Sequence, residues 1–492
     1  MHSGTGSIDV VTVTILIKTM TNPIHFTPSS LRITRLTVPE HVTVQALFGS
    51  MASLPWSQLL DSGGSTASKS RFDILVWSPA ITLSCKDGKT VIEDRREAET
   101  ATYSVSESPI DAAIALTSSF ENSVDAGALE AFNGLPFVLG MAGFISYDYG
   151  RYLEQLPDTN PNEYACPDFA GGLYDRAIIY DNQARQFYYC CLDYVEAFSV
   201  EALLETAQST HFALTSDWQS NLSKQAYLTG LEQIHDYLVA GDCYQVNFAQ
   251  RFSAKYQGNA WAAYKRLAQA NEAPFSAYIQ LPECSVISVS PERFIQCKDG
   301  QIETKPIKGT RPRFSDADQD VASANALLSA EKDRAENLMI VDLLRNDISK
   351  HSVPGSVKVP ELFSLESYPA VHHMVSKIQS QLLPDSHPLE LLAACFPGGS
   401  ITGAPKIRAM EVIEELEPSR RAIYCGSVFY LGIRRDLDSS ICIRTVLAEN
   451  NTLYCWAGGG IVLDSHPEEE FDETLAKVAK ILPVLESTLA ES

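Results

Sequence analysis

The chain has 492 residues, which is enough for two to four average domains or one large two-lobed one. Its 38 basic and 61 acidic residues give a formal net charge of −23, which argues against nucleic acid or an anionic membrane as the main partner. A small anionic substrate is compatible with this charge, because a few local cations or a bound metal reverse the potential inside one pocket.

The eleven cysteines form no CxxC pair, and an odd number without metal-ligand spacing predicts buried, reduced thiols in a cytoplasmic protein. No secretory signal is visible. The apolar run Val10–Ile17 is too short to span a bilayer, so we expect no membrane partner. This run suits a strand or a disordered extension, and Met20 leaves the true start of the chain open.

The chain as far as about residue 210 is rich in short β-like runs separated by turn residues, at 72–78, 135–150 and 186–195. The polar stretch 208–223 is a candidate boundary. We therefore expect an N-terminal extension over residues 1–30, for which disorder is one alternative, an N-terminal lobe over 31–210 and a catalytic domain over 211–492.

Clearer helices follow this boundary. Ser223 can cap a helix that ends before Gly241 and whose apolar face carries Tyr227, Leu231, Ile234 and Leu238. Gly230 lies inside that stretch and weakens the helix prediction slightly. A second helix is predicted over 331–349, with core residues Leu338, Val341 and Leu344.

Two further helices are predicted near the C-terminus. Pro405 suits the first turn of one, which stops before Pro418. Ser465 and Glu468 resemble a capping box that opens the last helix, with Pro467 near its start. Strand-like runs lie at 284–290, 301–305, 424–432, 440–448 and 453–459. This pattern predicts a large two-lobed α+β fold, with antiparallel sheets packed as a sandwich core and helices outside.

The segment KPIKGTRPR (305–313) carries four cations, two prolines and a glycine. A solvated basic turn is one interpretation. Lys308 is different, because an apolar neighbour such as Ile307 can lower the pKa of a lysine and Gly309 lets a ligand approach the backbone. These conditions suit an amine nucleophile.

Two glycine-rich segments could bind anions. FPGGSITGAPK (396–406), with Ser400 and Lys406, precedes a helix and is not a Walker loop. AGGGIV (457–462) follows a strand run and carries Gly458, Gly459 and Gly460. Ordinary tight turns are the alternative for both.

Carboxylates on two predicted helices could bind Mg²⁺ together with waters and substrate oxygens. Glu336 lies on one helix, and Glu468, Glu469, Glu470 and Glu473 lie near the start of another. A solvated acidic face is the alternative.

Together these segments resemble the chorismate-binding enzymes, a family that includes anthranilate, aminodeoxychorismate, isochorismate and salicylate synthases. The matching strings run in family order over about 223–480: GDCYQVNFAQRF, SVSPERF, PIKGTRPR, DRAENLMIVDLLRNDI, VHHMVS, FPGGSITGAPKIRAMEVIEELEP, ICIRT and AGGGIVLDSHPEEEFDET. LPWSQLLDSG (54–63) and SRFDIL (70–75) also resemble the aminodeoxychorismate branch.

Two positions distinguish the branches. Anthranilate synthases usually have alanine where this chain has Lys308, and aminodeoxychorismate synthases have lysine. Relatives that add water have a lysine base where this chain has Gln245, which cannot deprotonate water. The resemblance therefore implies an ammonia-using transferase that makes 4-amino-4-deoxychorismate for 4-aminobenzoate and folate biosynthesis.

The resemblance also implies residue roles. Lys308 would be the nucleophile, Glu292 of SPERF the general acid, and Glu336 and Glu470 the Mg²⁺ ligands. Substrate contacts would come from Gly309, Thr310, His373, Ser400, Tyr430, Arg444, Gly458, Gly459, Gly460, Gln245 and Lys406, of which Lys406 has a structural alternative.

The expected partner is a separate glutamine amidotransferase subunit, because this chain has no GxCxG glutaminase motif. A tightly bound L-tryptophan is possible in a pocket matched by Ser62, Ser70, Arg71, Phe72, Pro274, Phe275 and Ser276. The alternatives are anthranilate synthase component I, a water-adding isochorismate or salicylate synthase, and a non-catalytic tryptophan-binding paralogue.

Overall fold

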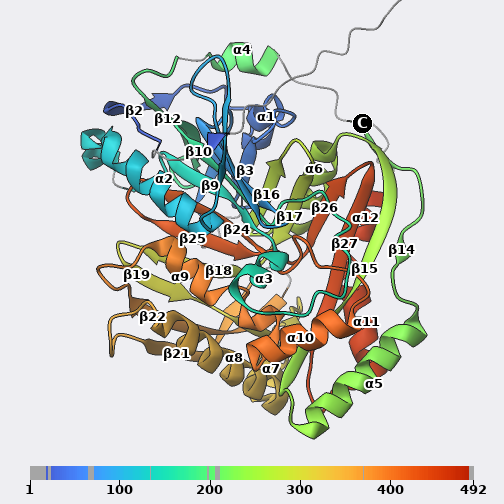
Figure 1. Cartoon of the computed structure of the whole chain (residues 1–492). Coiled ribbons are helices and arrows are strands. Elements are labelled where there is room, and N and C mark those ends of the chain that lie inside the picture. The colour runs from blue at the N-terminus through green and yellow to red at the C-terminus, as the bar shows by residue number, and fades with distance from the viewer. Residues whose placement is uncertain are drawn as a thin grey trace, which may run out of the picture.

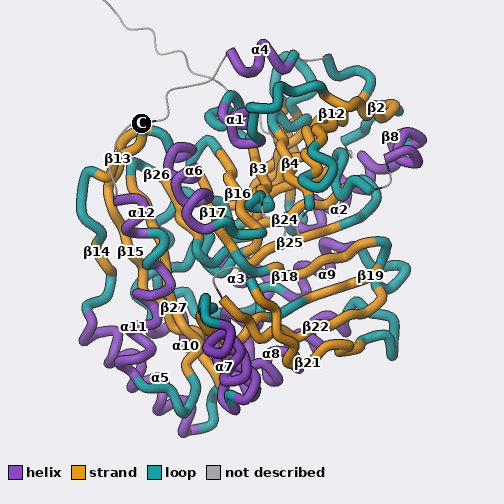
Figure 2. Tube along the Cα trace, turned by 180° about the vertical axis from the view of Figure 1, so that it is seen from behind, coloured by secondary structure: helices purple, strands orange, loops and turns teal. Residues whose placement is uncertain are grey.

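Two large sheets form the interior of the protein, and most helices lie outside them (Figures 1 and 2). The computed structural model describes residues 18–19, 24–64, 71–132, 134–196, 199–205, 211–368 and 371–486. Every strand pair in this part of the chain is antiparallel except β1 with β7 and β2 with β8. The predicted α+β architecture is confirmed.

Over the described residues, the first sheet has thirteen strands. Their order is β1 (Lys18–Thr19), β7 (Ala101–Val105), β6 (Lys89–Asp94), β5 (Ile81–Lys86), β10 (Phe169–Tyr174), β9 (Gly140–Ile145), β24 (Ser427–Gly432), β25 (Leu437–Ile441), β18 (Arg293–Lys298), β19 (Gln301–Thr304), β22 (Val371–Gln381) and β20 (Ile307–Pro312), with β21 (Lys358–Ser367) also paired to β22.

The second sheet has fourteen strands in the same part of the chain. Their order is β13 (Phe212–Leu214), β15 (Gln245–Gly258), β27 (Thr452–Ile461), β26 (Thr445–Glu449), β17 (Ser285–Ser290), β16 (Phe275–Gln280), β3 (Gln58–Asp61), β4 (Phe72–Val76), β11 (Arg176–Asp181), β12 (Gln186–Leu192), β2 (Ser29–Leu36) and β8 (Val124–Asp125), with β14 (Gln219–Ser220) and β23 (Gly403–Ala404) paired to β15.

The helices are mostly short. Those in the described residues are α1 (Val44–Gly49), α2 (Pro109–Ser123), α3 (Gly150–Leu153), α4 (Val200–Glu205), α5 (Lys224–Ala240), α6 (Ala260–Asn271), α7 (Ala317–Ser329), α8 (Glu331–Ser349), α9 (Pro388–Cys395), α10 (Lys406–Leu416), α11 (Pro467–Val478) and α12 (Leu482–Glu486), with 3₁₀ turns η1 (Gly127–Phe132), η2 (Tyr147–Tyr149) and η3 (Gly399–Ile401).

Each sheet contains strands from both sides of residue 210. In the first, β9 pairs with β24, and in the second, β3 pairs with β16. The division into lobes at this residue stays a prediction. Of residues 1–30, the described part includes β1 and the start of β2.

Helix α5 follows its predicted signals closely. The Ser223 hydroxyl accepts a hydrogen bond from the Ala226 amide, and Gly241 ends the helix with a left-handed φ of 81°. Packing explains the glycine at position 230, because a Cβ there would lie 2.6 Å from the Phe248 ring. A glycine inside the helix therefore lets α5 lie close against β15.

Some local predictions were wrong. Helix α8 has the predicted bounds, but Leu338 is 52% exposed, while Val341 and Leu344 are buried. No capping box forms at α11, whose N-cap is His466. Instead the Ser465 hydroxyl donates to Glu470, and α12 follows as a further helix.

Pro405 is the N-cap residue of α10 rather than part of its first turn. The run 440–448 is two strands, because the chain leaves one sheet after β25 and joins the other at β26. All eleven cysteines are buried and unpaired, as predicted. No helix in the described part of the chain is long and apolar enough to cross a bilayer, and the run Val10–Ile17 lies outside the described residues.

Candidate active site

Two crossings of the chain between the sheets bring Glu292 and Arg444 together. The chain passes from β17 to β18 through Glu292, and from β25 to β26 through Arg444, whose φ is 51°. Backbone hydrogen bonds tie the crossings to each other: the Ile441 amide donates to the Glu292 carbonyl, and the Val289 amide donates to the Arg444 carbonyl, both at 3.1 Å. The break in the predicted strand therefore places a cation near a buried acid.

Lys308 lies on a β-bulge at the edge of the first sheet. Ile307 pairs with Val375 and Thr310 with His373, so two residues of β20, Lys308 and Gly309, face one of β22. Gly309 takes a φ of 79°, and a Cβ there would lie 2.8 Å from Leu327 and 3.0 Å from Asp333. A bulge of this kind re-aims the neighbouring side chain, here that of Lys308.

The Lys308 ammonium lies 3.5 Å from the carbonyl oxygen of Ser400 on η3. Burial lowers the pKa of Lys308, and Lys477 lowers it further, while Glu336 and Glu292 act in the opposite direction. Burial has the largest effect, so the neutral amine is favoured relative to an ordinary lysine. A neutral amine is the form that can act as a nucleophile.

Glu292 is only 8% exposed. Burial raises its pKa to about 7, although Lys308, the Ile307 amide, the Ser400 hydroxyl and Arg444 all favour the charged carboxylate. At neutral pH a large fraction of this side chain therefore keeps its proton. A carboxyl group with such a pKa suits general acid catalysis.

Carboxylates from α8 and α11 complete one side of the site. Glu336 is half-buried, and burial raises its pKa, with Glu470 among the charges that add to this effect. Glu470 is 6% exposed and accepts the Ser465 hydroxyl at 2.6 Å. Within the described residues no group of three or more His, Cys, Asp or Glu side chains is arranged to hold a metal.

The glycine-rich end of β27 runs past these carboxylates. A Cβ at Gly459 would lie 3.1 Å from Glu470, and the Lys477 ammonium donates to the Gly458 carbonyl at 2.8 Å. A Cβ at Gly460 would lie 2.9 Å from the Gln245 amide nitrogen. Gln245 is fully buried, and neither of its amide atoms has a hydrogen-bond partner in the described structure.

His373 lies next to the bulge, with Nδ1 2.9 Å from the Thr310 hydroxyl. Burial lowers the pKa of His373 to about 4, and Arg444 contributes to this shift. The imidazole is therefore neutral at pH 7, able to donate or accept a hydrogen bond but carrying no charge.

Two of the expected substrate contacts are placed differently. The Lys406 ammonium is bound to Asp347 at 2.6 Å and to the Cys395 carbonyl at 3.0 Å, which favours its structural interpretation. Tyr430 lies on β24 and lines a second cavity, and its expected contact with a substrate carboxylate stays a prediction. Tyr430 lies opposite Asp438 in the pairing of β24 with β25, and both residues line that cavity.

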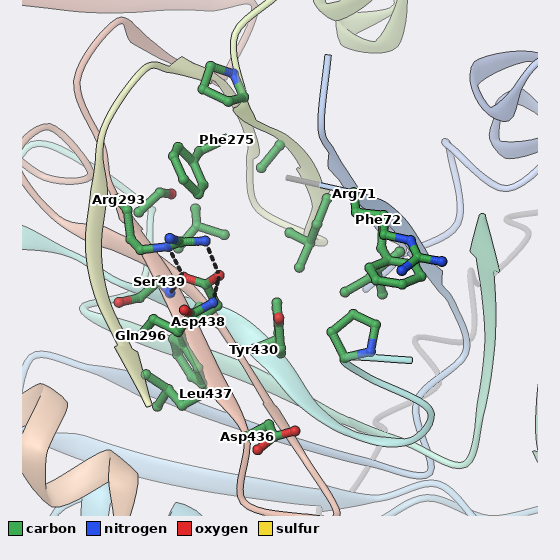
Figure 3. Close-up of a pocket in the computed structure, with 18 of the residues that line it drawn as sticks. Arg71, Phe72, Phe275, Arg293, Gln296, Tyr430, Asp436, Leu437, Asp438 and Ser439 are labelled. Carbon is green, nitrogen blue, oxygen red and sulfur yellow. Dashed lines mark hydrogen bonds and ion pairs between the residues drawn. The ribbon is translucent and has the colours of Figure 1, made fainter. Parts of the chain in front are cut away.

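The second cavity, of about 210 Å³, is bounded by both halves of the chain (Figure 3). Arg71 and Phe72 form one wall, and Phe275 and Arg293 form another. The Arg293 guanidinium binds Asp438 through two hydrogen bonds at 2.9 and 3.0 Å. Pro274 and Ser276 also line this cavity.

Two residues expected at this cavity are not among its described lining residues. The Ser62 hydroxyl instead accepts a hydrogen bond from the Asn182 amide at 3.0 Å, and the same amide also donates to Asp73. Ser70 lies outside the described residues.

Residues 66–483 match the family model described as chorismate binding enzyme. The chain belongs to the chorismate-binding enzyme family. This chorismate-binding enzyme is 46% identical over 444 residues to aminodeoxychorismate synthase component 1 of Escherichia coli (strain K12), covering 89% of this chain and 95% of that one. It is 47% identical over 442 residues to the Klebsiella aerogenes protein of the same name, covering 89% and 96%.

Solved structures agree with this assignment. The anthranilate synthase component I of Streptococcus pneumoniae TIGR4 superposes with a TM-score of 0.71 and 28% identity, covering 85% of this chain and 93% of that one. The menaquinone-specific isochorismate synthase MenF of Escherichia coli shares the fold, with a TM-score of 0.69, 16% identity and coverage of 95% and 97%. The expected resemblance to the aminodeoxychorismate branch is confirmed.

Sequence reasoning missed two cations of this chorismate-binding enzyme. Lys332 precedes Glu336 by one helical turn, and Lys477 follows Glu473 by one turn on α11. The i, i+4 spacing could have predicted both lysines, because it places each one on the same face of its helix as a carboxylate of the candidate site.

Proposed function

We propose that this chain is the chorismate-aminating subunit of 4-amino-4-deoxychorismate synthase, replacing the C4 hydroxyl of chorismate with ammonia. The observation that carries the proposal is the partly buried Lys308 amine, placed on a β-bulge and near enough to the protonatable acid Glu292 for each to influence the other's ionisation. The identity of 46% to a protein named aminodeoxychorismate synthase component 1 supports it.

The reaction needs two allylic displacements, since replacing the hydroxyl with retention of configuration is difficult in one. Lys308 attacks C2, the ring double bonds shift, and the C4–O bond breaks. Glu292 gives its proton to the departing hydroxyl, which leaves as water. Ammonia then forms a bond to C4, the double bonds shift back, and the lysine amine leaves C2.

Cations and backbone groups around the pocket suit a dianionic substrate. Arg444 lies beside Glu292, and Gly309 with Gly458, Gly459 and Gly460 leave room for carboxylates to approach the backbone. Neutral His373 with Thr310 would offer hydrogen bonds near the enolpyruvyl group or the leaving hydroxyl. Gln245 and Ser400 are further candidate contacts.

Glu336 and Glu470 would hold Mg²⁺. Two carboxylates from different helices, leaving positions for water and substrate oxygens, fit the usual binding of this ion. A bound Mg²⁺ would neutralise the ring carboxylate of chorismate and draw electron density from C2. Glu470 already attracts a cation, since the Lys332 ammonium lies 3.7 Å from it.

Ammonia would come from a separate glutamine amidotransferase subunit. The name "component 1" of the relatives is consistent with such a partner. Gln245 supports ammonia rather than water as the second reactant, because an amide cannot serve as the base that water requires.

The second cavity would hold L-tryptophan as a structural ligand. Its aromatic residues Phe72, Phe275 and Tyr430 suit an indole ring. Charges of both signs, including those of Asp61 and Arg71, suit the amino acid's ammonium and carboxylate groups.

The product formed from chorismate, Mg²⁺ and ammonium tests the proposed activity. We expect 4-amino-4-deoxychorismate in a chromatographic assay. Anthranilate together with released pyruvate would instead identify an anthranilate synthase, and isochorismate would identify a water-adding relative. Chorismate left unconsumed with magnesium and ammonium present would identify a non-catalytic paralogue.

A further inference from the structure

Lys332 is a cation that the proposed chemistry does not use. It lies in the first turn of α8, and its Nζ is 3.7 Å from Oε1 of Glu470 on α11. The lysine side chain is 49% exposed and the glutamate side chain only 7%. The pair therefore joins two helices through a half-exposed ammonium and a buried carboxylate.

Lys332 is placed near both proposed metal ligands. It is paired with Glu470 on α11, and it lies one helical turn before Glu336 on α8, where residues four apart share a face of the helix. A single cation shared by carboxylates of two helices is also the arrangement in which a divalent metal is bound.

We propose that Lys332 is the internal counter-ion of the metal site. Its ammonium neutralises the carboxylates and joins α8 to α11 when no metal is bound, and it is displaced into solvent when Mg²⁺ binds. This inference rests on the proposed Mg²⁺ ligands Glu336 and Glu470.

Competition follows from this arrangement. An ion that enters must first separate Glu470 from Lys332, so the apparent metal affinity is lower than that of the carboxylates alone. Half-exposed ion pairs contribute modestly because solvent screens them. Removing the ammonium should therefore tighten metal binding by about threefold to tenfold.

The chain offers a matched control in Lys224. This lysine is also 49% exposed and also forms an ion pair with α11, at 2.5 Å from Glu468. Glu468 is 64% exposed and is not a proposed ligand. Lys332→Gln and Lys224→Gln change the net charge equally, and each breaks one ion pair to the same helix.

Free Mn²⁺ measured by electron paramagnetic resonance during titration of the purified full-length chain, without chorismate, gives the affinity directly. Mn²⁺ takes the same oxygen ligands as Mg²⁺. We expect Lys332→Gln to bind Mn²⁺ about three to ten times more tightly than wild type, and Lys224→Gln to match wild type. Added Mg²⁺ should release the bound Mn²⁺ in all three proteins.

Unchanged or weaker binding by Lys332→Gln would overturn the proposal, as would an equal gain in both variants. A raised chorismate KM with unchanged metal affinity would make Lys332 a substrate contact instead. A wild-type chain that binds no Mn²⁺ would reject the metal ligands and the counter-ion together. The product assay is independent of this titration, so failure of the proposed reaction is recognised separately.

Discussion

Lys308 and Glu292 act at the residue scale as a pair that burial drives toward the neutral forms. Burial lowers the pKa of the amine and raises that of the carboxyl group, and each effect is the largest on its group. The mutual attraction of the charged forms opposes both shifts. The result is an amine and a carboxyl group near each other, each closer than in water to the protonation state that its proposed role requires.

Replacing Lys308 with alanine should slow formation of 4-amino-4-deoxychorismate from ammonium by about a thousandfold, because the first displacement loses its nucleophile. The product rate measures this loss. An intact-mass search of wild type should find a chorismate-derived adduct that Lys308→Ala lacks.

Lys305→Gln is the control for this change, since Lys305 lies just before β20 and its ammonium is 3.6 Å from Glu366. It should keep most of the activity. A near wild-type rate in Lys308→Ala would mean that ammonia attacks chorismate directly.

Glu292 should give the rate a falling limb near pH 7, since the acid loses its proton as pH rises through the raised pKa. The same shift costs stability. The folded state favours the protonated carboxyl, so its stabilising contribution is present below the unfolded value of about 4.5 and is lost as pH rises to about 7.

Glu292→Gln removes this ionisation. We expect it to lose most activity and yet to unfold at a higher temperature than wild type at pH 8, with a smaller difference at pH 5. Calorimetric scans of both proteins at the two pH values measure this. Equal differences at both pH values would argue against a buried, charged Glu292.

At the element scale, the bulge in β20 and the two crossings between the sheets bring the residues of the proposed site together. The bulge has left-handed backbone at Gly309, and one of the crossings has it at Arg444. Such conformations cost free energy and persist only where the surrounding structure maintains them. Here the surroundings are α7, α8 and the paired strands.

Gly309→Ala should reduce kcat/KM by about a hundredfold or more, because its Cβ would push against Leu327 and Asp333 and shift Lys308. Steady-state rates with ammonium measure the effect. Gly355 is the matched control, with a φ of 77° and no atom within 4 Å of an added Cβ.

Gly355→Ala should cost about 1 kcal/mol of stability from backbone strain and leave the rate unchanged. If the two variants lost activity equally, backbone strain alone would explain the loss. The contacts of Gly309 would then have no special role.

At the scale of the whole molecule, the two sheets make the halves of the chain interdependent. Strands β9 and β10 lie between β5 and β24, and strand β3 lies against β16. The second cavity likewise has walls from both halves. The residues of the proposed substrate site come after residue 211, but their strands belong to sheets that continue into the first 210 residues.

A fragment of residues 211–492 should therefore fail to fold alone, because β24 and β16 would become exposed sheet edges. Circular dichroism and thermal unfolding of the fragment test this. A soluble monomer with a cooperative transition would establish the expected catalytic domain as an independent unit.

Local sequence determined the features that depend on neighbouring residues. Ser223 and Gly241 bound α5 as predicted, and 331–349 is one helix, because capping and helical periodicity act over a few residues. Local motifs also indicated the chemistry of Lys308 and of the carboxylates on two helices. The family resemblance supplied Glu292 and the expected role of each residue.

Tertiary structure alone decided where distant segments meet. It carried Tyr430 to the second cavity, broke 440–448 at Arg444, exposed Leu338 and brought Lys332 to Glu470. Each depends on which strand pairs with which, or on which helix lies opposite. Those pairings join residues far apart in the chain, so local patterns do not contain them.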